Sequence, residues 1–312
     1  MRIAFLGLGH MGLPMAKNLA AAGHQVTGYD VFPAAVDAGR EAGLATAESG
    51  TAAVRPAGAS GGAQVVITMF QTGRQVLDAY RGADAGEGLL AVAEPGTLFI
   101  DCSTISVDDA REAHALAEAA GHRSLDAPVS GGVVGAENAT LAFMVGGSEE
   151  DFAAARPFLE AMGRRVVHCG GAGLGQAAKV CNNMILAVSQ IAVAEAFVLG
   201  ERLGLSHQAL FDVASNASGQ CWALTTNCPV PGPVPTSPAN RDYQPGFAGA
   251  LMSKDLGLAE HAVTATGVDA RMGMLARELY ARYADGPGAG QDFSGIINTI
   301  RDQSARAGEG DR

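Results

Sequence analysis

The chain has 312 residues, of which 48% are hydrophobic, and this is enough to fill the core of one large domain or two ordinary ones. Its formal net charge is −11, and no stripe of Lys and Arg stands in the sequence to replace the counterions of a nucleic acid. We therefore expect a globular protein that has neither a nucleic acid nor a membrane surface as its partner.

The cysteines and histidines follow no metal-binding or disulfide pattern. The five cysteines are odd in number and never spaced C-x-x-C, and the seven histidines form no H-x-x-x-H pair. This predicts no metal site and favours a reducing cytoplasm. The N-terminus superficially resembles a signal peptide, but Gly7, Gly9 and Gly12 interrupt its short apolar run. Elsewhere we expect no segment of about 18 apolar residues that could span a bilayer.

Strands and helices alternate through the first half of the chain. Hydrophobic patterning predicts strands at residues 2–6, 25–30, 63–70, 96–104, 141–147 and 164–170. Between them it predicts helices at residues 14–23, 33–43, 106–121 and 149–162. Ser106 is the expected N-cap of the third helix, and Asp108 and Asp109 lie in its first turn. This alternation is typical of a parallel sheet covered by helices on both faces.

The pattern changes at about Leu174, where a segment of some thirty residues without proline predicts one long helix. The rest of the chain reads as helical, except for the Pro-rich residues 227–247. We therefore predict a sheet domain at residues 1–168 and an all-helical domain at residues 169–312. No internal repeat is evident.

A G-x-G-x-x-G motif directly follows the first predicted strand and opens the first predicted helix; its residues are Gly7, Leu8, Gly9, His10, Met11 and Gly12. In this context the glycines allow a tight turn and close backbone approach to a pyrophosphate at a helix N-terminus. Asp30 ends the second strand, where a carboxylate can accept hydrogen bonds from a ribose and repel a 2′-phosphate. The alternative is an ordinary turn and a solvated strand end. The strand, the glycines, the helix and the acid follow one another in the order that dinucleotide binding requires. This predicts binding of NAD, in preference to NADP.

Several segments resemble the β-hydroxyacid dehydrogenase family, and together they extend over nearly the whole chain. They are FLGLGHMGLPMAKNL, DCSTIS, DAPVSGGVVGAENATLAFMVGG, GQAAKVCNNM, ALMSKDLGLA and QDFSGIIN. The fold that this resemblance implies is an α/β Rossmann-type N-terminal domain followed by an all-α C-terminal domain. A long interdomain helix joins the two, and the helical domain serves in oligomerisation.

Lys179 is the candidate for proton transfer. Oxidation of an alcohol requires a group that accepts the hydroxyl proton, and an amine is available where neither a metal nor a histidine accompanies the motifs. Asn183 lies four residues later, on the same helix face. From spacing alone a solvated helix face is the simpler interpretation. The resemblance implies instead that Lys179 is the catalytic base or acid and that Asn183 orients the substrate.

The resemblance assigns further residues to the site. Ser130, Gly131 and Gly132 would hold the substrate carboxylate, and a hydroxyl with two unencumbered backbone N–H groups suits an anion. Lys254 would reach the substrate and the nicotinamide, although it also reads as a surface lysine paired with Asp255. The remaining cofactor contacts implied are Thr104, Met69 and Phe70. At the last two this chain departs from the family, which usually has Met-Leu-Pro where Met69-Phe70-Gln71 stands. Trp222 and Phe247 are expected to pack in the core; the alternative is that they line the space around the substrate methyl group.

The activity implied is the NAD-dependent oxidation of 3-hydroxyisobutyrate to methylmalonate semialdehyde, in valine breakdown. Sibling activities remain open: an L-serine dehydrogenase, or a reductase of tartronate or succinic semialdehyde. A remote alternative is a non-catalytic dinucleotide sensor that keeps the fold. The expected partners are a small hydroxy acid and further copies of the chain, as a homodimer or homotetramer.

Overall fold

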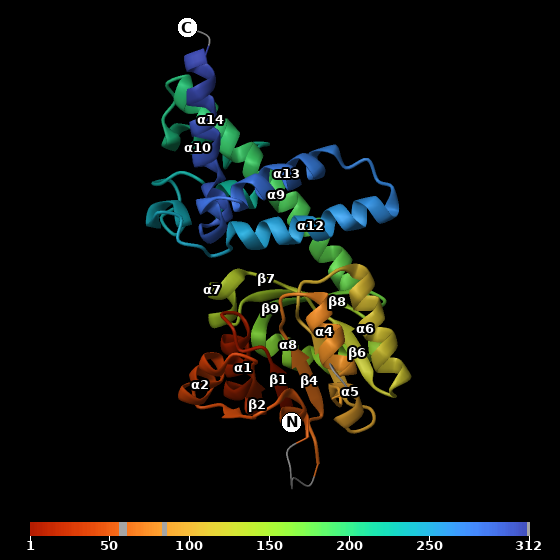
Figure 1. Cartoon of the computed structure of the whole chain (residues 1–312). Helices are drawn as coiled ribbons and strands as arrows, with labels where there is room; N and C mark the ends of the chain where they lie inside the picture. The colour runs from red at the N-terminus through yellow and green to blue at the C-terminus, as the bar shows by residue number, and fades with distance from the viewer. Residues whose placement is uncertain (56–60, 83–85, 311–312) are drawn as a thin grey trace. The chain divides into compact units, whose positions relative to one another are not determined.

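The computed structural model describes residues 1–55, 61–82 and 86–310. It divides into two compact units, Met1–Lys179 and Val180–Arg312, and each is described by itself. The long helix α9, Leu174–Arg202, begins in the first unit and continues into the second (Figure 1). Its 29 residues confirm the long helix that the sequence predicts. The predicted domain boundary at residue 168 stays a prediction.

The first unit is built on a nine-stranded sheet with the order β3-β2-β1-β4-β5-β6-β8-β7, and β9 pairs with β8. The strands are β1 (Arg2–Leu6), β2 (Gln25–Tyr29), β3 (Ala45–Thr46), β4 (Val65–Thr68), β5 (Leu98–Asp101), β6 (Arg123–Asp126), β7 (Val129–Ser130), β8 (Leu141–Gly146) and β9 (Gly163–Gly170). Chain order runs outward in both directions from β1 and β4. The carboxyl ends of these two strands therefore form a topological switch point, where α/β sheets bind their ligands.

The prediction of a parallel sheet is confirmed for β1 to β6, but it is wrong for β8 and β9. β8 pairs antiparallel with both β6 and β7, and β9 pairs parallel with β8, so β8 and β9 run opposite to β1 to β6. The reason lies in the connection between β7 and β8, which is only residues 131–140. A crossover that keeps two strands parallel needs a dozen residues or more.

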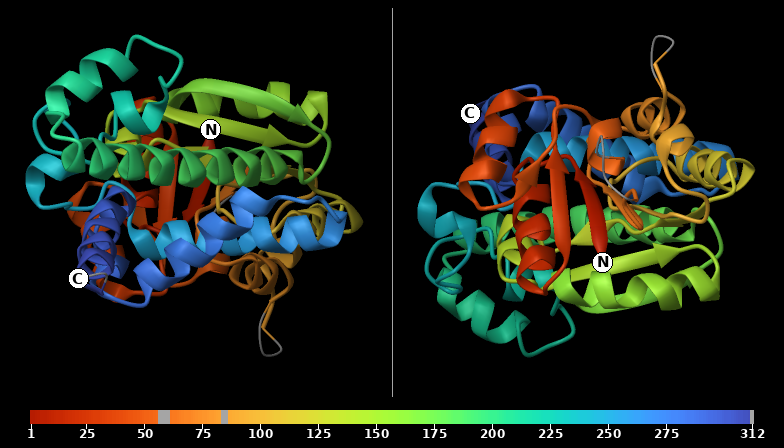
Figure 2. Two further views of the ribbon diagram at one scale, coloured as in Figure 1. Left: turned by 90° about the horizontal axis from the view of Figure 1, so that it is seen from above. Right: turned by 90° about the horizontal axis from the view of Figure 1, so that it is seen from below.

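Alternate side chains of the central strands enter two separate cores, as the period of a β-strand requires. Ile3 and Phe5 pack on one face with Met15 and Leu19 of α1. Ala4 and Leu6 pack on the other face, and helices cover both faces of the sheet (Figure 2). The helices of this unit are α1 (Gly12–Ala21), α2 (Pro33–Glu41), α3 (Gly50–Val54), α4 (Gly73–Arg81), α5 (Leu89–Val92), α6 (Val107–Ala119), α7 (Gly132–Glu137) and α8 (Glu149–Met162). The first core is covered by α1 and α8, and the second by α3 to α6.

The predicted cap of α6 is confirmed, because the Ser106 hydroxyl accepts a hydrogen bond from Asp109 N at 3.0 Å. Helix α4, which the sequence analysis did not predict, begins with a complete capping box. Thr72 accepts from Gln75 N, and the Gln75 side chain accepts from Thr72 N.

The second unit is helical, as predicted. Its elements after α9 are α10 (His207–Ala214), α11 (Trp222–Thr225), η1 (Pro238–Arg241), α12 (Gly249–Thr266), α13 (Arg271–Ala284), η2 (Pro287–Gly290), η3 (Phe293–Gly295) and α14 (Ile296–Gly310). Phe247 lies against the core of this unit, but the expectation for Trp222 is wrong, because its side chain is 51% exposed. Trp222 is the first residue of a one-turn helix, and Leu224, two residues later in the same turn, is the side chain that enters the core there.

One expectation about membrane segments also needs correction. Helix α9 is long and apolar enough to span a bilayer, with a mean hydropathy of 1.6 in its most apolar window. The buried residues of its C-terminal part, from Ala187 to Val198, belong to the hydrophobic core of the second unit. Length and composition do not distinguish a core helix from a membrane span. The contacts with the core of the second unit identify α9 as a core helix.

The Pro-rich segment folds around one buried carboxylate, that of Asp292. Its Oδ2 accepts from Gly246 N and Phe247 N, both at 3.1 Å, and its Oδ1 accepts from Asn227 Nδ2 at 3.1 Å. Oδ1 also accepts from the backbone and the hydroxyl of Ser294. Asp292 therefore fixes both ends of residues 227–247, directly before α12 begins.

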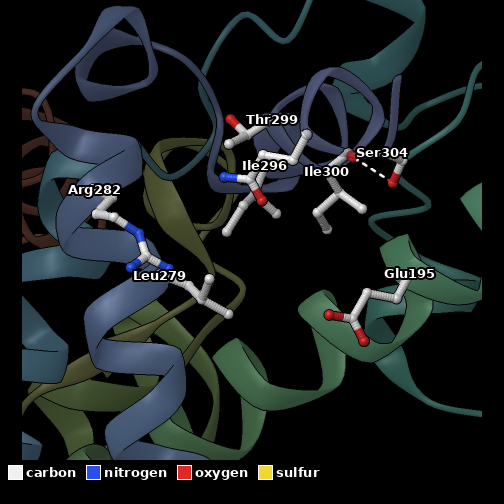
Figure 3. A pocket seen from close by; sticks show the side chains of 8 residues that line it. Glu195, Leu279, Arg282, Ile296, Thr299, Ile300 and Ser304 are labelled. Atoms are coloured by element: carbon white, nitrogen blue, oxygen red, sulfur yellow. Dashed lines mark hydrogen bonds between the residues drawn. The ribbon is translucent and has the colours of Figure 1, made fainter. Parts of the chain in front are cut away.

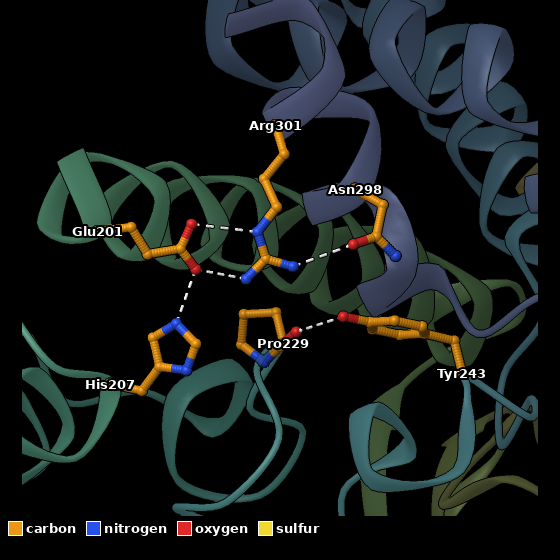
Figure 4. A network of polar contacts seen from close by, with 6 residues as sticks. All are labelled: Glu201, His207, Pro229, Tyr243, Asn298 and Arg301. Carbon is orange, nitrogen blue, oxygen red and sulfur yellow. Dashed lines mark hydrogen bonds and ion pairs between the residues drawn. The ribbon is translucent and has the colours of Figure 1, made fainter. Parts of the chain in front are cut away.

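A second polar network joins α9, α10 and α14 (Figure 4). Arg301 on α14 donates to both carboxylate oxygens of Glu201 near the end of α9. His207 Nε2 at the start of α10 lies 2.7 Å from Glu201 Oε1. The hydrogen bond from Arg301 lowers the pKa of Glu201, and the same pairing raises the pKa of Arg301. These contacts connect α9, α10 and α14 within this unit.

Asp101, the last residue of β5, is a buried carboxylate that is only partly satisfied. Its Oδ1 accepts from the Thr68 hydroxyl at 2.8 Å and from the Ser103 hydroxyl at 2.6 Å. Its Oδ2 has no hydrogen-bond partner among the residues that the structure describes. Burial raises the pKa of Asp101 from 3.8 to about 6, against the opposing effect of these hydrogen bonds.

Asp101→Asn should flatten the dependence of stability on pH. Because the folded-state pKa of Asp101 lies above its ordinary value, its favourable contribution is complete below pH 3.8 and is lost as pH rises through about 6. The rise corresponds to about 3 kcal/mol at most. Urea unfolding between pH 4 and 7.5 should show the wild type losing stability across this window and Asp101→Asn losing less. Asp37→Asn, at an exposed ion pair with Arg40, is the control; equal slopes in all three proteins would contradict the assignment.

Candidate active site

The glycine loop follows β1 and leads into α1. Gly7 has a φ of +97°, and a Cβ there would lie 2.3 Å from Met69 O. A Cβ on Gly12 would lie 1.8 Å from Gly7 O. In contrast, a Cβ on Gly9 would meet nothing within 4 Å. Gly7 and Gly12 are therefore required by the protein's own backbone, whereas Gly9 leaves open space beside the N-terminus of α1. This open space fits the pyrophosphate of a dinucleotide.

Asp30 directly follows β2 and lies beside this loop. Its Oδ2 accepts from Leu8 N at 2.7 Å, and its Oδ1 accepts from Phe32 N at 2.9 Å. The Leu8 side chain is buried and packs where Gly28 leaves room. His10 is exposed and Met11 is half-buried. The carboxylate of Asp30 is thus held at the strand end, where the ribose of a dinucleotide would lie.

Two further strand-end loops carry Met69, Phe70 and Thr104, and hydrogen bonds tie these loops together. Phe70 N donates to the Ser103 hydroxyl at 2.8 Å, and that hydroxyl donates to Asp101. Asp101 and Ser103, which hold the loop of Thr104, were not among the residues predicted from the sequence. The signal for them was the DCST segment, in which an acid ends a buried strand and a serine follows two residues later.

The predicted anion site lies at the junction of β7 and α7. Ser130 ends β7, and Gly131 and Gly132 follow with φ values of +134° and +61°. A side chain would be strained at both glycines. Gly131 is exposed, and Ser130 and Gly132 are half-buried. Their role in holding a substrate carboxylate stays a prediction.

Lys179 and Asn183 both lie on α9, about one helical turn apart. The interpretation as a solvated helix face does not hold, because Lys179 is 6% exposed and Asn183 is 2% exposed. Burial of an amine and an amide costs free energy. Such a pair on successive turns is therefore typical of a site that serves binding or catalysis.

In the second unit, Asp255 orients Asn183. Asn183 Nδ2 donates to Asp255 Oδ2 at 2.6 Å, while Asn183 Oδ1 accepts from Asn182 Nδ2 at 3.1 Å. Lys254 Nζ lies 3.5 Å from Asp255 Oδ1. The sequence analysis treated Asp255 only as a possible partner of Lys254. The structure shows a 5% exposed carboxylate on α12 that engages both predicted site residues of this unit.

Two surface depressions lie away from these residues. In the second unit, a groove of about 110 Å³ lies between α9, α13 and α14, and Glu195, Arg282 and Ile300 are among its lining residues (Figure 3). In the first unit, a depression of about 380 Å³ lies at the opposite ends of the strands, around Arg2 and Arg123. Neither contains a predicted site residue. Among the described residues, no group of His, Cys, Asp and Glu could hold a metal ion.

The contrast between Gly9 and Gly12 can be tested directly. Gly9→Ala should leave thermal stability unchanged but weaken NAD binding by about tenfold or more, because its methyl group enters the space assigned to the pyrophosphate. Gly12→Ala should destabilise the fold itself, because its methyl group has no room beside Gly7. The measurements are calorimetric titration with NAD and differential scanning calorimetry. NAD binding by Gly9→Ala at wild-type affinity would rule out the open space as the pyrophosphate site.

The comparisons with known proteins agree with this geometry. Residues 2–171 match the family described as the NAD binding domain of 6-phosphogluconate dehydrogenase. Residues 173–300 match the NAD-binding family of NADP-dependent 3-hydroxyisobutyrate dehydrogenase.

Individual relatives are similar over nearly the whole chain. A probable 3-hydroxyisobutyrate dehydrogenase of Mycobacterium tuberculosis is 58% identical over 96% of this chain and 97% of its own length. An NAD-dependent L-serine dehydrogenase of Pseudomonas aeruginosa is 47% identical over 94% and 95%. The solved structure of Mycobacterium tuberculosis 3-hydroxyisobutyrate dehydrogenase with L-serine superposes with a TM-score of 0.89, covering 96% of this chain and 98% of that one. The chain therefore belongs to the β-hydroxyacid dehydrogenase family, and its first unit is an NAD-binding domain.

Proposed function

We propose that this protein catalyses the NAD-dependent oxidation of 3-hydroxyisobutyrate to methylmalonate semialdehyde. The observation that carries the proposal is the buried pair of Lys179 and Asn183 on successive turns of α9. The first unit also supplies the open space at Gly9 and the carboxylate of Asp30. The identity of 58% with a probable 3-hydroxyisobutyrate dehydrogenase over nearly the whole chain supports this choice of substrate.

In the proposed reaction, the neutral amine of Lys179 accepts the hydroxyl proton as the carbon–oxygen double bond forms. Bound NAD supplies the acceptor for the hydride that leaves the carbinol carbon. Ser130, Gly131 and Gly132 hold the substrate carboxylate through a hydroxyl and backbone N–H groups. Asn183, oriented by Asp255, positions the substrate beside the amine.

L-Serine is the second candidate substrate. The Pseudomonas aeruginosa relative is an L-serine dehydrogenase, and the solved structure of the Mycobacterium tuberculosis enzyme contains L-serine. Both substrates are 3-hydroxypropanoates with a terminal hydroxymethyl group, and they differ in the group at C2, which is methyl in one and ammonium in the other. The same proton acceptor and carboxylate site serve either one, so a comparison of kcat/KM decides between them.

Lys179→Ala should lower kcat by about a thousandfold or more with either substrate, because no other group takes the hydroxyl proton. The dissociation constant of the Lys179→Ala variant for NAD should stay within about threefold of the wild-type value. The assay follows absorbance at 340 nm, and Lys17→Ala, at an exposed position of α1, is the control. Full activity of Lys179→Ala would contradict the mechanism, and a wild type inactive toward all hydroxy acids would favour the dinucleotide sensor.

We further propose that the enzyme acts in the cytoplasm, in valine breakdown. All five cysteines lie within the part of the chain that the structure describes, and all are free thiols, as a reducing compartment favours. Valine breakdown is the process that the resemblance to this family implies.

We also propose that the helical unit mediates self-association, as a dimer or tetramer. Large apolar side chains are exposed on and beside α9: Ile185 (64%), Leu199 (60%) and Leu203 (76%). Between them Ala192 and Ala196 are exposed as well. These five residues form an uncharged strip, and the exposed Glu195 lies beside it. An apolar strip of this kind is typical of a surface covered by another chain.

Leu199→Glu combined with Leu203→Glu should convert the oligomer to a monomer, because a charge would have to be buried at the interface. Light scattering after size exclusion should then give 31.6 kDa for the variant, the mass of one chain, and a multiple of that mass for the wild type. Val167→Glu, on the exposed side of β9 in the first unit, is the control. A variant that keeps the wild-type mass would exclude this surface.

A further inference from the structure

The first turn of α9 is capped by a side chain from the sheet. The first N–H groups of a helix have no partner within the helix. Here Asp126, the last residue of β6, accepts from Gly173 N at 2.8 Å through Oδ1 and from Gln176 N at 2.9 Å through Oδ2. His114 Nε2 of α6 lies 3.0 Å from the same Oδ1. Asp126 is 1% exposed, and both of its carboxylate oxygens accept a hydrogen bond from the start of α9.

Two glycines permit this approach. A Cβ on Gly146 would lie 2.4 Å from Asp126 Oδ1 and 2.7 Å from Gly175 N. A Cβ on Gly175 would lie 2.4 Å from Met144 O and 2.7 Å from Asp126 O. The end of β8, the end of β6 and the start of α9 therefore meet at backbone contact, which leaves the helix start little freedom to shift.

Gln176 connects the same helical turn to the loop that follows β5. Its side chain is fully buried; Nε2 donates to Ser103 O at 2.7 Å, and Oε1 accepts from Ile105 N at 3.2 Å. These two backbone groups flank Thr104, the predicted cofactor contact. Lys179 follows Gln176 by three residues, on the adjacent helical turn.

We propose that Asp126 and Gln176 are positioning residues for Lys179: together they fix the α9 turn that carries the amine against the loop that carries Thr104. The inference rests on the proposed function of Lys179 as the proton acceptor. Neither residue touches the reacting atoms in this account. Their contribution is to hold the distance between the amine and the nicotinamide end of the cofactor, to which catalysis is sensitive, since a displacement of about 1 Å costs about a hundredfold in rate.

The chain offers a matched pair of variants for the test. Gln176→Met removes both side-chain hydrogen bonds and keeps the length of the side chain. Gln190→Met makes the same change on the same helix at another fully buried glutamine, whose amide atoms have no hydrogen-bond partner among the described residues. Asp126→Asn adds a third variant, in which an amide N–H would face the backbone donors of α9.

Gln176→Met should lower kcat by about tenfold to a hundredfold, while KM and the NAD dissociation constant change less than threefold. Gln190→Met should keep kcat within twofold. Asp126→Asn should show the same changes in kcat, KM and NAD binding as Gln176→Met. If Asp126→Asn does not fold, the comparison of Gln176→Met with Gln190→Met tests the proposal. Wild-type kcat in Gln176→Met would overturn the proposal. So would a loss of kcat accompanied by equal losses of NAD binding and thermal stability, since that result indicates a general role in folding.

Two measurements without turnover separate this inference from the proposed function. Amide hydrogen exchange of residues 173–182 should be faster in Gln176→Met than in the wild type and Gln190→Met. Reductive methylation of Lys179, measured relative to Lys17 in the same molecule, should accelerate several-fold in Gln176→Met alone. If the wild type oxidises no hydroxy acid but both effects appear, the proposed function fails and the anchoring of Lys179 stands. Unchanged exchange and methylation would refute the anchoring itself.

Discussion

The carboxylate of Asp126 is the constraint on which the rest of the first unit depends. It lies at the end of β6, yet it accepts backbone N–H groups from the start of α9, so it determines where the long helix leaves the sheet. A charged acceptor at a helix N-terminus is favourable both as a hydrogen bond and through the helix dipole. Because this contact is buried and surrounded by glycine backbone, the start of the helix has little freedom to shift.

The carboxyl ends of the strands are organised by buried polar groups rather than by apolar packing. Asp101 and Asp126 stand opposite each other in the register of β5 and β6. The first ties the loops after β4 and β5 together, and the second anchors α9. Each buried carboxylate carries a cost, which is visible in the raised pKa of Asp101. Such a cost is typical of functional sites, where geometry is maintained at the expense of stability.

Carboxylates organise the second unit in the same way. Asp292 gathers donors from both ends of the Pro-rich segment, and Asp255 fixes the amide of Asn183. The proline residues exclude a long α-helix or a central strand from residues 227–247, so many backbone donors of this segment need partners elsewhere. A single buried acid, Asp292, is the acceptor for two of them, and this gives a defined shape to a segment that has only the short helix η1.

The sequence alone determined the features that depend on local patterns. The alternation of strands and helices, the glycine loop with Asp30, the cap at Ser106 and the long helix with Lys179 all follow from periodicity, spacing and the resemblance to one family. Tertiary structure decided the rest. It decided the antiparallel pairing of β8 and the exposure of Trp222. It also decided the contacts by which Asp126, Gln176, Asp255 and Asp292 anchor distant segments, which join residues 45 to 73 positions apart in the chain. An isolated acid or amide in a sequence looks the same whether it is solvated or buried, and only the folded chain supplies the donors that distinguish the two.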